Sequence, residues 1–242
     1  KQLKKQQDKL LITERYSAWE SVARKLAHEI KNPLTPIQLS IDRLKEKYGN
    51  KISGDTSDFK KYLETISRQV KDIENLANEF SKFARMPGPI LKKIDINLTV
   101  KRSVDFMNMS TINTINFKPL PKASFINGDE GQLYRVFINL IKNSEESFLE
   151  ISEKKPDFKG IIDIELALNN DYITINIIDN GTGIEDIDRV MTPYFTTKKN
   201  GTGLGLPIVN KIINEHSGEF FIFNKNNKGI EVVISIPIIN EK

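Results

Sequence analysis

The sequence contains no cysteine, only two histidines and one tryptophan, and no long apolar run in its 242 residues. The absence of cysteine excludes disulfide bonds and thiolate metal sites, and it fits a reducing compartment. The lack of an apolar run of roughly 20 residues argues against a membrane-spanning helix. No glycine is followed by Lys-Ser or Lys-Thr, so the sequence has no P-loop. What is present, 38% hydrophobic and 28% charged residues, is typical of a globular chain with room for two modest cores.

Positive charge is in slight excess but is not clustered. The formal net charge is +4, and the lysines that produce it are spread over the whole sequence. A nucleic-acid-binding surface needs basic residues gathered on one face, so we expect no nucleic acid among the partners. The chain starts at Lys1 inside a polar pattern, without an initiator methionine. We therefore expect it to be part of a longer protein.

Two long amphipathic helices are predicted in the first third of the chain. Apolar residues recur at intervals of three, four or seven from Ala18 to Tyr48, and again from Phe59 to Phe83. The polar segment "KISGDTSD" joins the two stretches, and "MPGP" follows the second. The pattern predicts a helical hairpin, with residues 1–17 as an incoming helix. Such a hairpin cannot bury both apolar stripes alone, so we expect a homodimer that forms a four-helix bundle.

The rest of the chain has the texture of an α/β domain. Short segments rich in β-branched residues predict strands: "SFING", "GIIDIELAL", "YITINIIDN", "EFFIFN" and "GIEVVISIPI". Two helices are predicted, over 130–150 with Asp129 as the N-cap, and over 203–216 after a glycine-rich stretch. "FNKNNKG" predicts a hairpin turn between the last two strands.

The segment "HEIKNP" is the first candidate for a catalytic site. Helical spacing turns His28 away from the apolar stripe, with Glu29 beside it and Asn32 one turn later. Pro33 and Pro36 cannot donate backbone hydrogen bonds, so we expect a bend just after His28. Glu29 could hold the proton on one ring nitrogen while the other attacks an electrophile. The alternative is an ordinary surface histidine near a kink.

The same segment imitates the zinc motif H-E-x-x-H. Asn32 stands where the second histidine ligand belongs, and the other histidine, His216, is far away in the sequence. The spacing therefore excludes a zinc site of that type.

Two glycine clusters and an asparagine pair suggest a ligand site. In "IIDNGTGI", Asp179 at a strand end could accept a hydrogen bond from an exocyclic amine, although a plain hairpin turn is the alternative. "GTGLGLPIVNKI" is not a dinucleotide-binding fingerprint, because Leu206 replaces the third glycine and no strand precedes it. A glycine-rich turn that leads into a helix N-terminus can instead hold phosphates.

The predicted helix over 130–150 carries Asn139 and Asn143 four residues apart, hence on one face. Their carbonyl oxygens suit Mg²⁺, although a solvated face would explain them equally. Between the glycine clusters, "MTPYFTTKKN" is short, offers threonine and lysine to phosphates, and is interpreted as a mobile lid.

Taken in order, "HEIKNP", "NLIKNSEES", "DNGTGI", "PYFTTK" and "GTGLGLPIV" resemble the H, N, G1, F and G2 boxes of the sensor histidine kinases of two-component systems. The match spans nearly the whole chain, and the H-box region is similar to the nitrogen-regulation NtrY-type subgroup. The resemblance implies a linker helix over 1–17 and a helical-hairpin dimerisation and histidine phosphotransfer domain over 18–88. An α/β sandwich ATP-binding domain of the gyrase/Hsp90/histidine-kinase/MutL type would follow over 89–242.

The resemblance also implies roles for individual residues. His28 would be the phosphoacceptor, Glu29 its general base or orienting group, and Asn32 would position water when the protein acts as a phosphatase. Asn143 would coordinate Mg²⁺, and Asp179 would recognise the adenine amine of ATP. Further nucleotide contacts are implied at Asn139, Gly181, Gly183, Thr197, Lys198, Gly201, Thr202, Gly203, Leu204 and Gly205.

Two features depart from the commonest family pattern. Ser144 and Ser147 stand where alanines are usual, a change that should not affect the metal ligand. The lid is also short, which puts the sequestration of ATP in doubt.

The function that the resemblance implies is an ATP-dependent protein-histidine kinase that passes its phosphoryl group to an aspartate of a response regulator receiver domain, with possible phosphatase activity. The expected setting is the cytoplasmic region of a bacterial inner-membrane protein, attached to the membrane only through a missing N-terminal sensor part. A clamp-type ATPase is disfavoured because Asn139 replaces its hydrolytic glutamate. A dimeric scaffold with a regulatory pocket is a further alternative, and a nucleic-acid binder would lose affinity steeply with salt.

Overall fold

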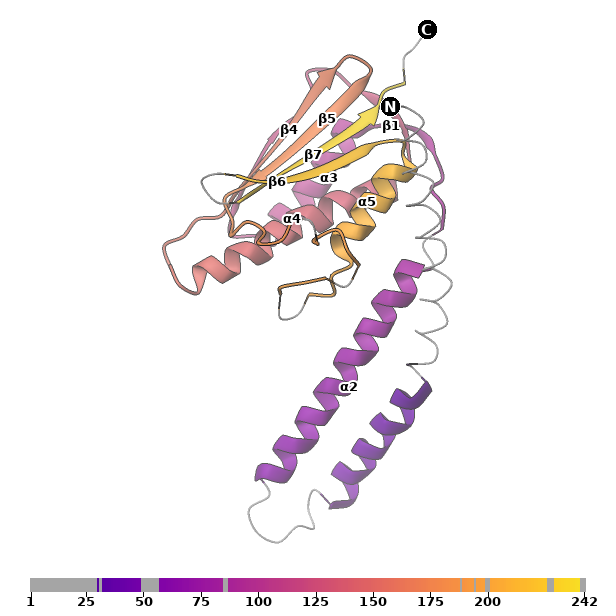
Figure 1. The fold of residues 1–242 in the computed structure, drawn as a ribbon, viewed down its shortest axis with the longest axis vertical. Helices are drawn as coiled ribbons and strands as arrows, with labels where there is room; N and C mark the ends of the chain where they lie inside the picture. The colour runs from indigo at the N-terminus through magenta and orange to yellow at the C-terminus, as the bar shows by residue number, and fades with distance from the viewer. Residues whose placement is uncertain are drawn as a thin grey trace. The chain divides into compact units, whose positions relative to one another are not determined.

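The computed structural model describes residues 30, 32–48, 57–84, 87–187, 189–193, 195–198, 201–225 and 229–239. The chain divides into two compact units, the first ending at Pro87 and the second beginning at Gly88 (Figure 1). The predicted linker helix over 1–17 lies outside the described residues.

The first unit is a helical hairpin. Residues 32–48 form its first described helical stretch, and α2 (Ser57–Ala84) forms the second. Apolar side chains from both helices make one buried cluster, Leu34, Ile41, Leu63 and Val70, with Ile30 and Phe59 packed against it. This packing confirms the predicted hairpin. The bend predicted just after His28 falls on residues outside the described part.

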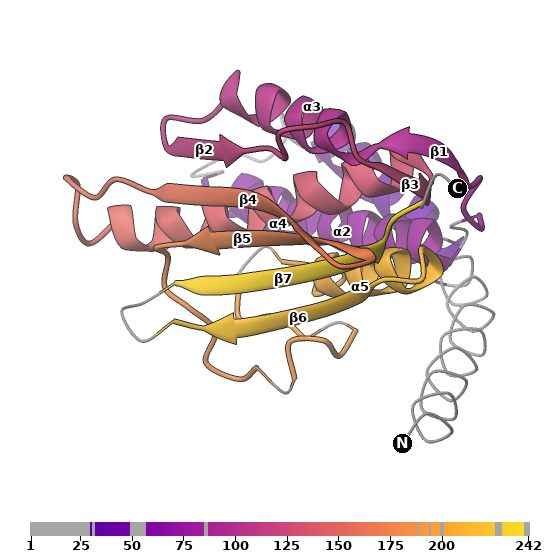
Figure 2. The same cartoon turned by 90° about the horizontal axis from the view of Figure 1, so that it is seen from above.

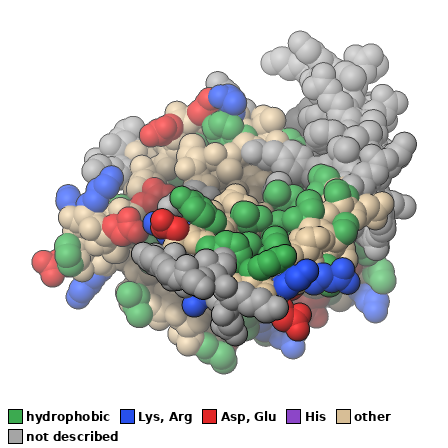
Figure 3. Space-filling model, turned by 90° about the horizontal axis from the view of Figure 1, so that it is seen from below, with side chains coloured by type: hydrophobic (Ala, Val, Ile, Leu, Met, Phe, Trp, Pro, Cys, Tyr) green, Lys and Arg blue, Asp and Glu red, His purple; other side chains and the backbone are tan. Residues whose placement is uncertain are grey.

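The hairpin also leaves apolar surface uncovered. Seven large side chains are between 41% and 65% exposed: Ile37, Leu39, Leu44, Tyr48, Tyr62, Ile66 and Ile73. Hydrophobic side chains lie exposed on the face of the molecule drawn in Figure 3 as well. One copy of the hairpin therefore buries only part of its apolar surface, as the sequence pattern predicts.

The second unit is built on a five-stranded sheet (Figure 2). Its strands, in spatial order, are β2 (Thr114–Lys118), β4 (Ile161–Asn169), β5 (Tyr172–Asp179), β7 (Ile230–Pro237) and β6 (Glu219–Asn224). The β2–β4 pair is parallel and the other pairs are antiparallel. A separate antiparallel pair consists of β1 (Lys92–Asp95) and β3 (Phe125–Gly128).

Three helices cover one face of this sheet: α3 (Ile96–Asn108), α4 (Glu130–Ser152) and α5 (Gly205–Glu215) (Figures 1 and 2). Burial alternates along the strands that face them, so that Ile173, Ile175 and Ile177 of β5 are at most 2% exposed. The period of two places one face of the strand in the core and the other outside. The result is the predicted two-layer α/β sandwich.

Several local predictions are confirmed. Asp129 is the N-cap of α4, and its Oδ1 accepts a hydrogen bond from the backbone N–H of Gln132 at 3.1 Å. The strands on either side of "FNKNNKG" pair antiparallel, as a hairpin requires. The alternative hairpin turn at "DNG" is wrong, because β5 pairs with β4 and β7 and not with the segment that follows it.

The prediction of only two helices in this unit is also wrong, because α3 is a third, and β1 and β2 were missed with it. Helix α3 buries two hydroxyl residues, Thr99 and Ser103, among its apolar ones. Their hydroxyls donate to the carbonyls of Asp95 and Thr99, four residues earlier in each case. These internal hydrogen bonds let polar residues occupy buried positions of the helix. The buried face of α3 therefore does not appear in the sequence as a regular repeat of apolar residues. None of the helices in the described ranges is long and apolar enough to cross a membrane.

Candidate functional site

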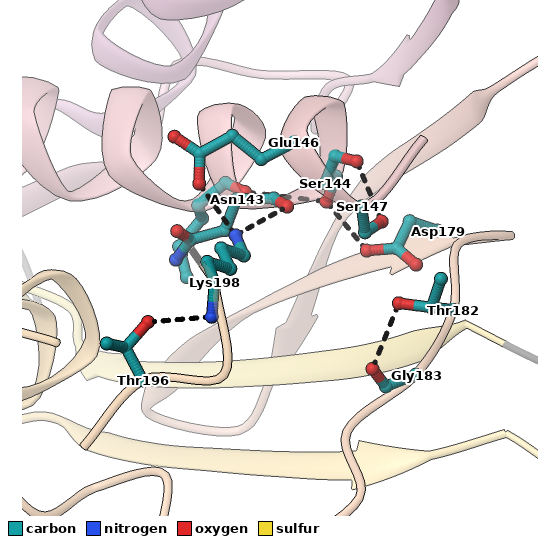
Figure 4. A network of polar contacts seen from close by, with 10 residues as sticks. Asn143, Ser144, Glu146, Ser147, Asp179, Thr182, Gly183, Thr196 and Lys198 are labelled. Carbon is teal, nitrogen blue, oxygen red and sulfur yellow. Dashed lines mark hydrogen bonds and ion pairs between the residues drawn. The ribbon is translucent and has the colours of Figure 1, made fainter. Parts of the chain in front are cut away.

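A polar network lies where the end of β5, the middle of α4 and the segment before α5 meet (Figure 4). The packing of α4 against α5 and the pairing of β5 in the centre of the sheet bring these segments together. The residues labelled in Figure 4 come from three of the five sequence boxes: "NLIKNSEES", "DNGTGI" and "PYFTTK".

Asp179 is the buried centre of the network, with 5% of its surface exposed. Its Oδ1 accepts hydrogen bonds from the backbone N–H groups of Gly181 at 2.9 Å and Ile230 at 3.1 Å. Its Oδ2 accepts a hydrogen bond from the Ser144 hydroxyl at 2.7 Å. A carboxylate offers about four acceptor positions, so the described residues fill three and leave one, on Oδ2. The structure thus prepares Asp179 to receive one more donor.

Glycines make the surroundings of Asp179 possible. A side chain at Gly229 would place its Cβ 1.9 Å from the Asp179 carbonyl oxygen, and Gly229 has φ +87°. This close approach puts the N–H of Ile230 within reach of the carboxylate. A Cβ at Gly181 would lie 2.0 Å from the Ser147 hydroxyl oxygen. Only glycine fits position 229, where the Cβ would meet backbone, whereas a side chain at position 181 would require Ser147 to move.

The loop after Asp179 is tied to the end of β6. Asn224 Oδ1 accepts from the backbone N–H of Ile184 at 2.8 Å, and its Nδ2 donates to the Ile184 carbonyl at 2.6 Å. Gly183, with φ +81°, would place a Cβ 3.1 Å from Asn224 Oδ1. Gly183 therefore serves the turn that brings this loop against β6.

Asn143 lies beside the start of α5. A Cβ built on Gly205 would be 3.8 Å from Asn143 Nδ2 and 3.9 Å from its Oδ1. The N-cap residue of α5, Leu204, makes no side-chain capping hydrogen bond. The first backbone N–H groups of a helix have no intrahelical acceptor, so this end of α5 can receive an anion. An amide oxygen and a helix N-terminus are thus neighbours.

Lys198 reaches α4 from the lid segment. Its Nζ forms an ion pair with Glu146 Oε2 at 2.7 Å and donates a hydrogen bond to the Asn143 backbone carbonyl at 3.3 Å (Figure 4). The Lys198 side chain is 28% exposed and that of Glu146 is 37% exposed. The lysine predicted to contact nucleotide is therefore held next to the predicted metal ligand.

The remaining box residues of the second unit have simpler settings. Gly201 donates its N–H to the Lys198 carbonyl at 3.2 Å, and Gly203 has φ +65°. Leu204 is buried, with 1% exposed, and fixes the turn to the core. Thr197 is exposed and Thr202 is partly exposed. Asn139, on α4, is partly buried.

The predicted catalytic residues of the first unit are only partly visible. His28 and Glu29 lie outside the described residues. Asn32 is described, and it is an exposed residue at the start of the helical stretch over 32–48.

His216 ties together the two helices that carry the site. It is 2% exposed, its Nε2 accepts from the backbone N–H of Asp129 at 2.9 Å, and its Nδ1 lies 2.7 Å from the Ile212 carbonyl oxygen. Burial lowers the pKa of His216, although the hydrogen bond to Ile212 and the charge of Asp129 oppose that shift. Burial acts to raise the pKa of Asp129, but backbone hydrogen bonds from Ile90, Gln132 and Gly131 outweigh it, so that this pKa is lowered.

Sequence reasoning missed five residues that shape the site: Ser144, Glu146, Asn224, Gly229 and Ile230. The sequence places Gly229 only in a hairpin turn. The glycine that follows "NKNNK" was the one local sign that the backbone here approaches another segment closely. Ser144 was noted only as a small departure from the family pattern. Glu146, Asn224 and Ile230 make contacts between segments that are far apart in the chain. No local sequence pattern predicts such contacts.

Two family models match the chain. One, described as "Histidine kinase-, DNA gyrase B-, and HSP90-like ATPase", matches residues 128–240. The other, described as "His Kinase A (phospho-acceptor) domain", matches residues 18–89.

Similar proteins include nitrogen regulation protein NtrY of Azorhizobium caulinodans, 41% identical over 213 residues, which cover 86% of this chain and 27% of NtrY. An NtrY-like sensor histidine kinase of Rickettsia typhi is 38% identical over 243 residues, which cover 98% of this chain and 39% of that protein. Sporulation kinase C of Bacillus subtilis is 30% identical over 233 residues, which cover 93% of this chain and 50% of that protein. The chain spans half or less of the length of these relatives.

Solved structures share the fold. Histidine kinase ThkA in complex with the response regulator TrrA gives a TM-score of 0.57 at 21% identity, covering 98% of this chain and 67% of that one. Full-length ShkA in complex with AMPPNP gives 0.60 at 19% identity, covering 91% and 46%. The matches to both units agree with the geometry of the site, and the chain belongs to the ATP-dependent sensor histidine kinases of two-component systems, in the NtrY-type subgroup.

Proposed function

We propose that the protein phosphorylates itself on His28 with Mg-ATP and passes the phosphoryl group to an aspartate of a response regulator receiver domain. The observation that carries the proposal is the buried Asp179 carboxylate, which has three internal donors and one open acceptor position. A carboxylate prepared in this way suits one of the two N–H groups of the adenine amine.

The phosphates of ATP would lie against the start of α5. The uncapped helix N-terminus offers backbone N–H groups, and Lys198 brings a positive charge from the lid. Gly205, the first residue of α5, leaves this end of the helix without a side chain beside Asn143. These residues position the nucleotide rather than react with it.

The residues also fit Mg²⁺. Among the described residues, no group of three or more His, Asp or Glu side chains could hold a metal ion. Mg²⁺ commonly takes only one or two protein ligands and completes its shell with water and phosphate oxygens. The Asn143 amide oxygen beside Gly205 would supply such a ligand. When bound, the ion neutralises phosphate charge.

In the proposed step a ring nitrogen of His28 attacks the terminal phosphorus of ATP. The bond from that phosphorus to the bridging oxygen breaks, ADP leaves, and Glu29 accepts the ring proton or orients the ring. The phosphoryl group then moves from the ring nitrogen to a carboxylate oxygen of the regulator. Asn32 would position water for the opposite, phosphatase, activity, and its exposure is compatible with that role.

The proposal includes a homodimer formed through the hairpin, supported by its seven exposed apolar side chains. It also places the chain on the cytoplasmic side of a bacterial inner membrane, within a longer sensor protein. The support for this setting is membership of the NtrY-type subgroup.

Two variants test the proposal by separating binding from transfer. His28→Ala should abolish transfer of label from ATP to the protein and leave ATP affinity unchanged. Asp179→Ala should weaken ATP binding itself, because the acceptor for the amine is lost. Acid-labile label that persists in His28→Ala would refute the proposed acceptor. ATP turnover without any protein-bound label would favour the clamp-type ATPase instead.

A further inference from the structure

Ser144 behaves differently from the other helix serines of the second unit. Ser103 and Ser152 donate their hydroxyls to the carbonyl four residues earlier, at 3.0 and 2.9 Å. Ser147 donates to the carbonyl three residues earlier, at 2.8 Å. These are the bonds that a serine inside a helix ordinarily makes. The corresponding distance from Ser144 to the Leu140 carbonyl is 3.4 Å.

The Ser144 hydroxyl is instead directed at Asp179. It lies 2.7 Å from Asp179 Oδ2, and Ser144 is 2% exposed. A hydroxyl has one hydrogen to donate, and a short O–H···O⁻ bond to a carboxylate is stronger than a long one to a neutral carbonyl. The proton of Ser144 therefore serves the carboxylate.

We propose that Ser144 is a positioning residue that makes Asp179 selective for a purine with a 6-amino group. The inference rests on the proposed function, in which Asp179 receives the adenine amine. Two backbone N–H groups hold Oδ1, and the Ser144 hydroxyl holds Oδ2, so the plane of the carboxylate is fixed at both oxygens. One acceptor position stays open at a defined place, and it matches one N–H donor.

Loss of the hydroxyl changes this arrangement at Oδ2 only. In Ser144→Ala the two bonds to Oδ1 remain, whereas Oδ2 has two open positions and no side-chain donor to hold it. Water can then occupy the position that the amine requires. Discrimination between purines with and without the amine should fall, while contacts to ribose and phosphates are unaffected.

The test is a comparison of two ligands across three proteins. Affinities for ATP and for purine riboside triphosphate, which has hydrogen in place of the amine, are measured by calorimetry with Mg²⁺. The full chain, Ser144→Ala and Ser152→Ala are compared. Ser152→Ala is the matched control, because Ser152 is on the same helix, lies outside the polar network of the site, and donates its hydroxyl to the Phe148 backbone carbonyl. Alanine favours helices, so both variants should fold, and thermal unfolding verifies it.

The unchanged chain should prefer ATP by about tenfold or more, the usual worth of a hydrogen bond to a charged group. Ser144→Ala should lose about fivefold in ATP affinity and less than about twofold in affinity for the analogue, because the variant disturbs only the placement of Oδ2 and keeps the hydrogen bond from the amine itself. Ser152→Ala should change the affinity for neither ligand.

Equal losses for both ligands in Ser144→Ala would show a merely structural role and overturn the inference, as would an unchanged preference for ATP. Both outcomes leave the proposed function standing. If the unchanged chain does not prefer ATP over the analogue, the role of Asp179 in the proposed function fails, and the inference fails with it.

Discussion

The hairpin and the α/β unit differ in how completely each buries its own apolar side chains. In the α/β unit, side chains on both layers reach 0–2% exposure, among them Phe137, Ile175 and Ile212. In the hairpin, the buried cluster consists of four residues that are 4–8% exposed, and seven large apolar side chains are exposed. Both units are built from elements with one apolar face. Only the sandwich has a second layer within the same unit that covers these apolar faces.

This difference separates the tasks of the two units. A closed core can hold the Asp179 carboxylate and its three donors in fixed positions, as recognition of a ligand requires. An incompletely buried hairpin suits association with a second copy and with a partner protein. The following changes should affect one unit and spare the other.

The largest effect is expected from Gly229→Ala. The new Cβ would lie 1.9 Å from the Asp179 carbonyl oxygen, at a residue with φ +87°, so the backbone at the end of β5 or at the start of β7 must shift. We expect the unfolding free energy of the α/β unit to fall by about 2–4 kcal/mol and ATP affinity to fall at least about tenfold. Calorimetric melting and ATP titration measure the two quantities.

Gly131→Ala is the matched control for that variant. Gly131 lies in the first turn of α4, and its Cβ would meet only Asp129 Oδ1, at 3.4 Å. Alanine should stabilise this position by about 0.5–1 kcal/mol and leave ATP binding unchanged. Equal behaviour of the two variants would contradict the role assigned to Gly229.

The hairpin should respond to Ile66→Asp. Ile66 is 45% exposed in one copy, and the four-helix bundle would bury it. An unpaired charge in an apolar interface is strongly unfavourable, so the dimer dissociation constant should rise at least about tenfold. Sedimentation equilibrium measures it, and Gln69→Asp, at an exposed polar position of the same helix, is the control. A dimer of unchanged affinity would show that this face is not the interface.

A pH effect should be confined to the α/β unit. The pKa of His216 is lowered in the folded protein, so below the ordinary value of 6.5 the unfolded chain takes up a proton that the folded chain does not. Stability of this unit should therefore be complete above pH 6.5 and decrease as the pH falls below it. Urea unfolding at pH 7.5 and 5.5 should show a smaller difference for His216→Gln. Equal pH dependence in both proteins would contradict the assignment.

The smallest effect is expected from Glu146→Gln. The ion pair with Lys198 is about a third exposed on each side, and such a pair contributes about 0–1 kcal/mol. The melting temperature should hardly change. Glu165→Gln, which breaks the exposed pair with Lys118 on the sheet, is the control. A loss above about 2 kcal/mol in Glu146→Gln would show that the pair is a structural requirement of the lid.

The sequence predicted the parts of the molecule whose pattern is local. Helical spacing identified α2, enrichment in β-branched residues identified β4, β5 and β7, and Asp129 marked the start of α4. Helix α3 was missed because Thr99 and Ser103 are buried with their hydroxyls bonded inside the helix. Strand β2 was missed because TINFK is short and forms a half-buried edge of the sheet.

For the site, Asp179, Gly181 and Gly183 could be named from the sequence, but Gly229 and the hydrogen-bond partners of Asp179 could not. Ser144 meets Asp179 across 35 residues, Ile230 across 51, and Glu146 meets Lys198 across 52. Only the packing of α4 and α5 on the sheet brings these groups together. The sequence contains the components, and the fold decides which of them touch.

The measurement that tests the central claim most directly is the identification of the phosphorylated residue. The full chain is incubated with ATP and Mg²⁺, digested at neutral pH, and mapped by mass spectrometry. We expect a single phosphorylated residue, His28, whose phosphate is lost in acid and retained in base. Phosphate on a serine, threonine or aspartate instead, from a chain that binds ATP normally, would contradict the account.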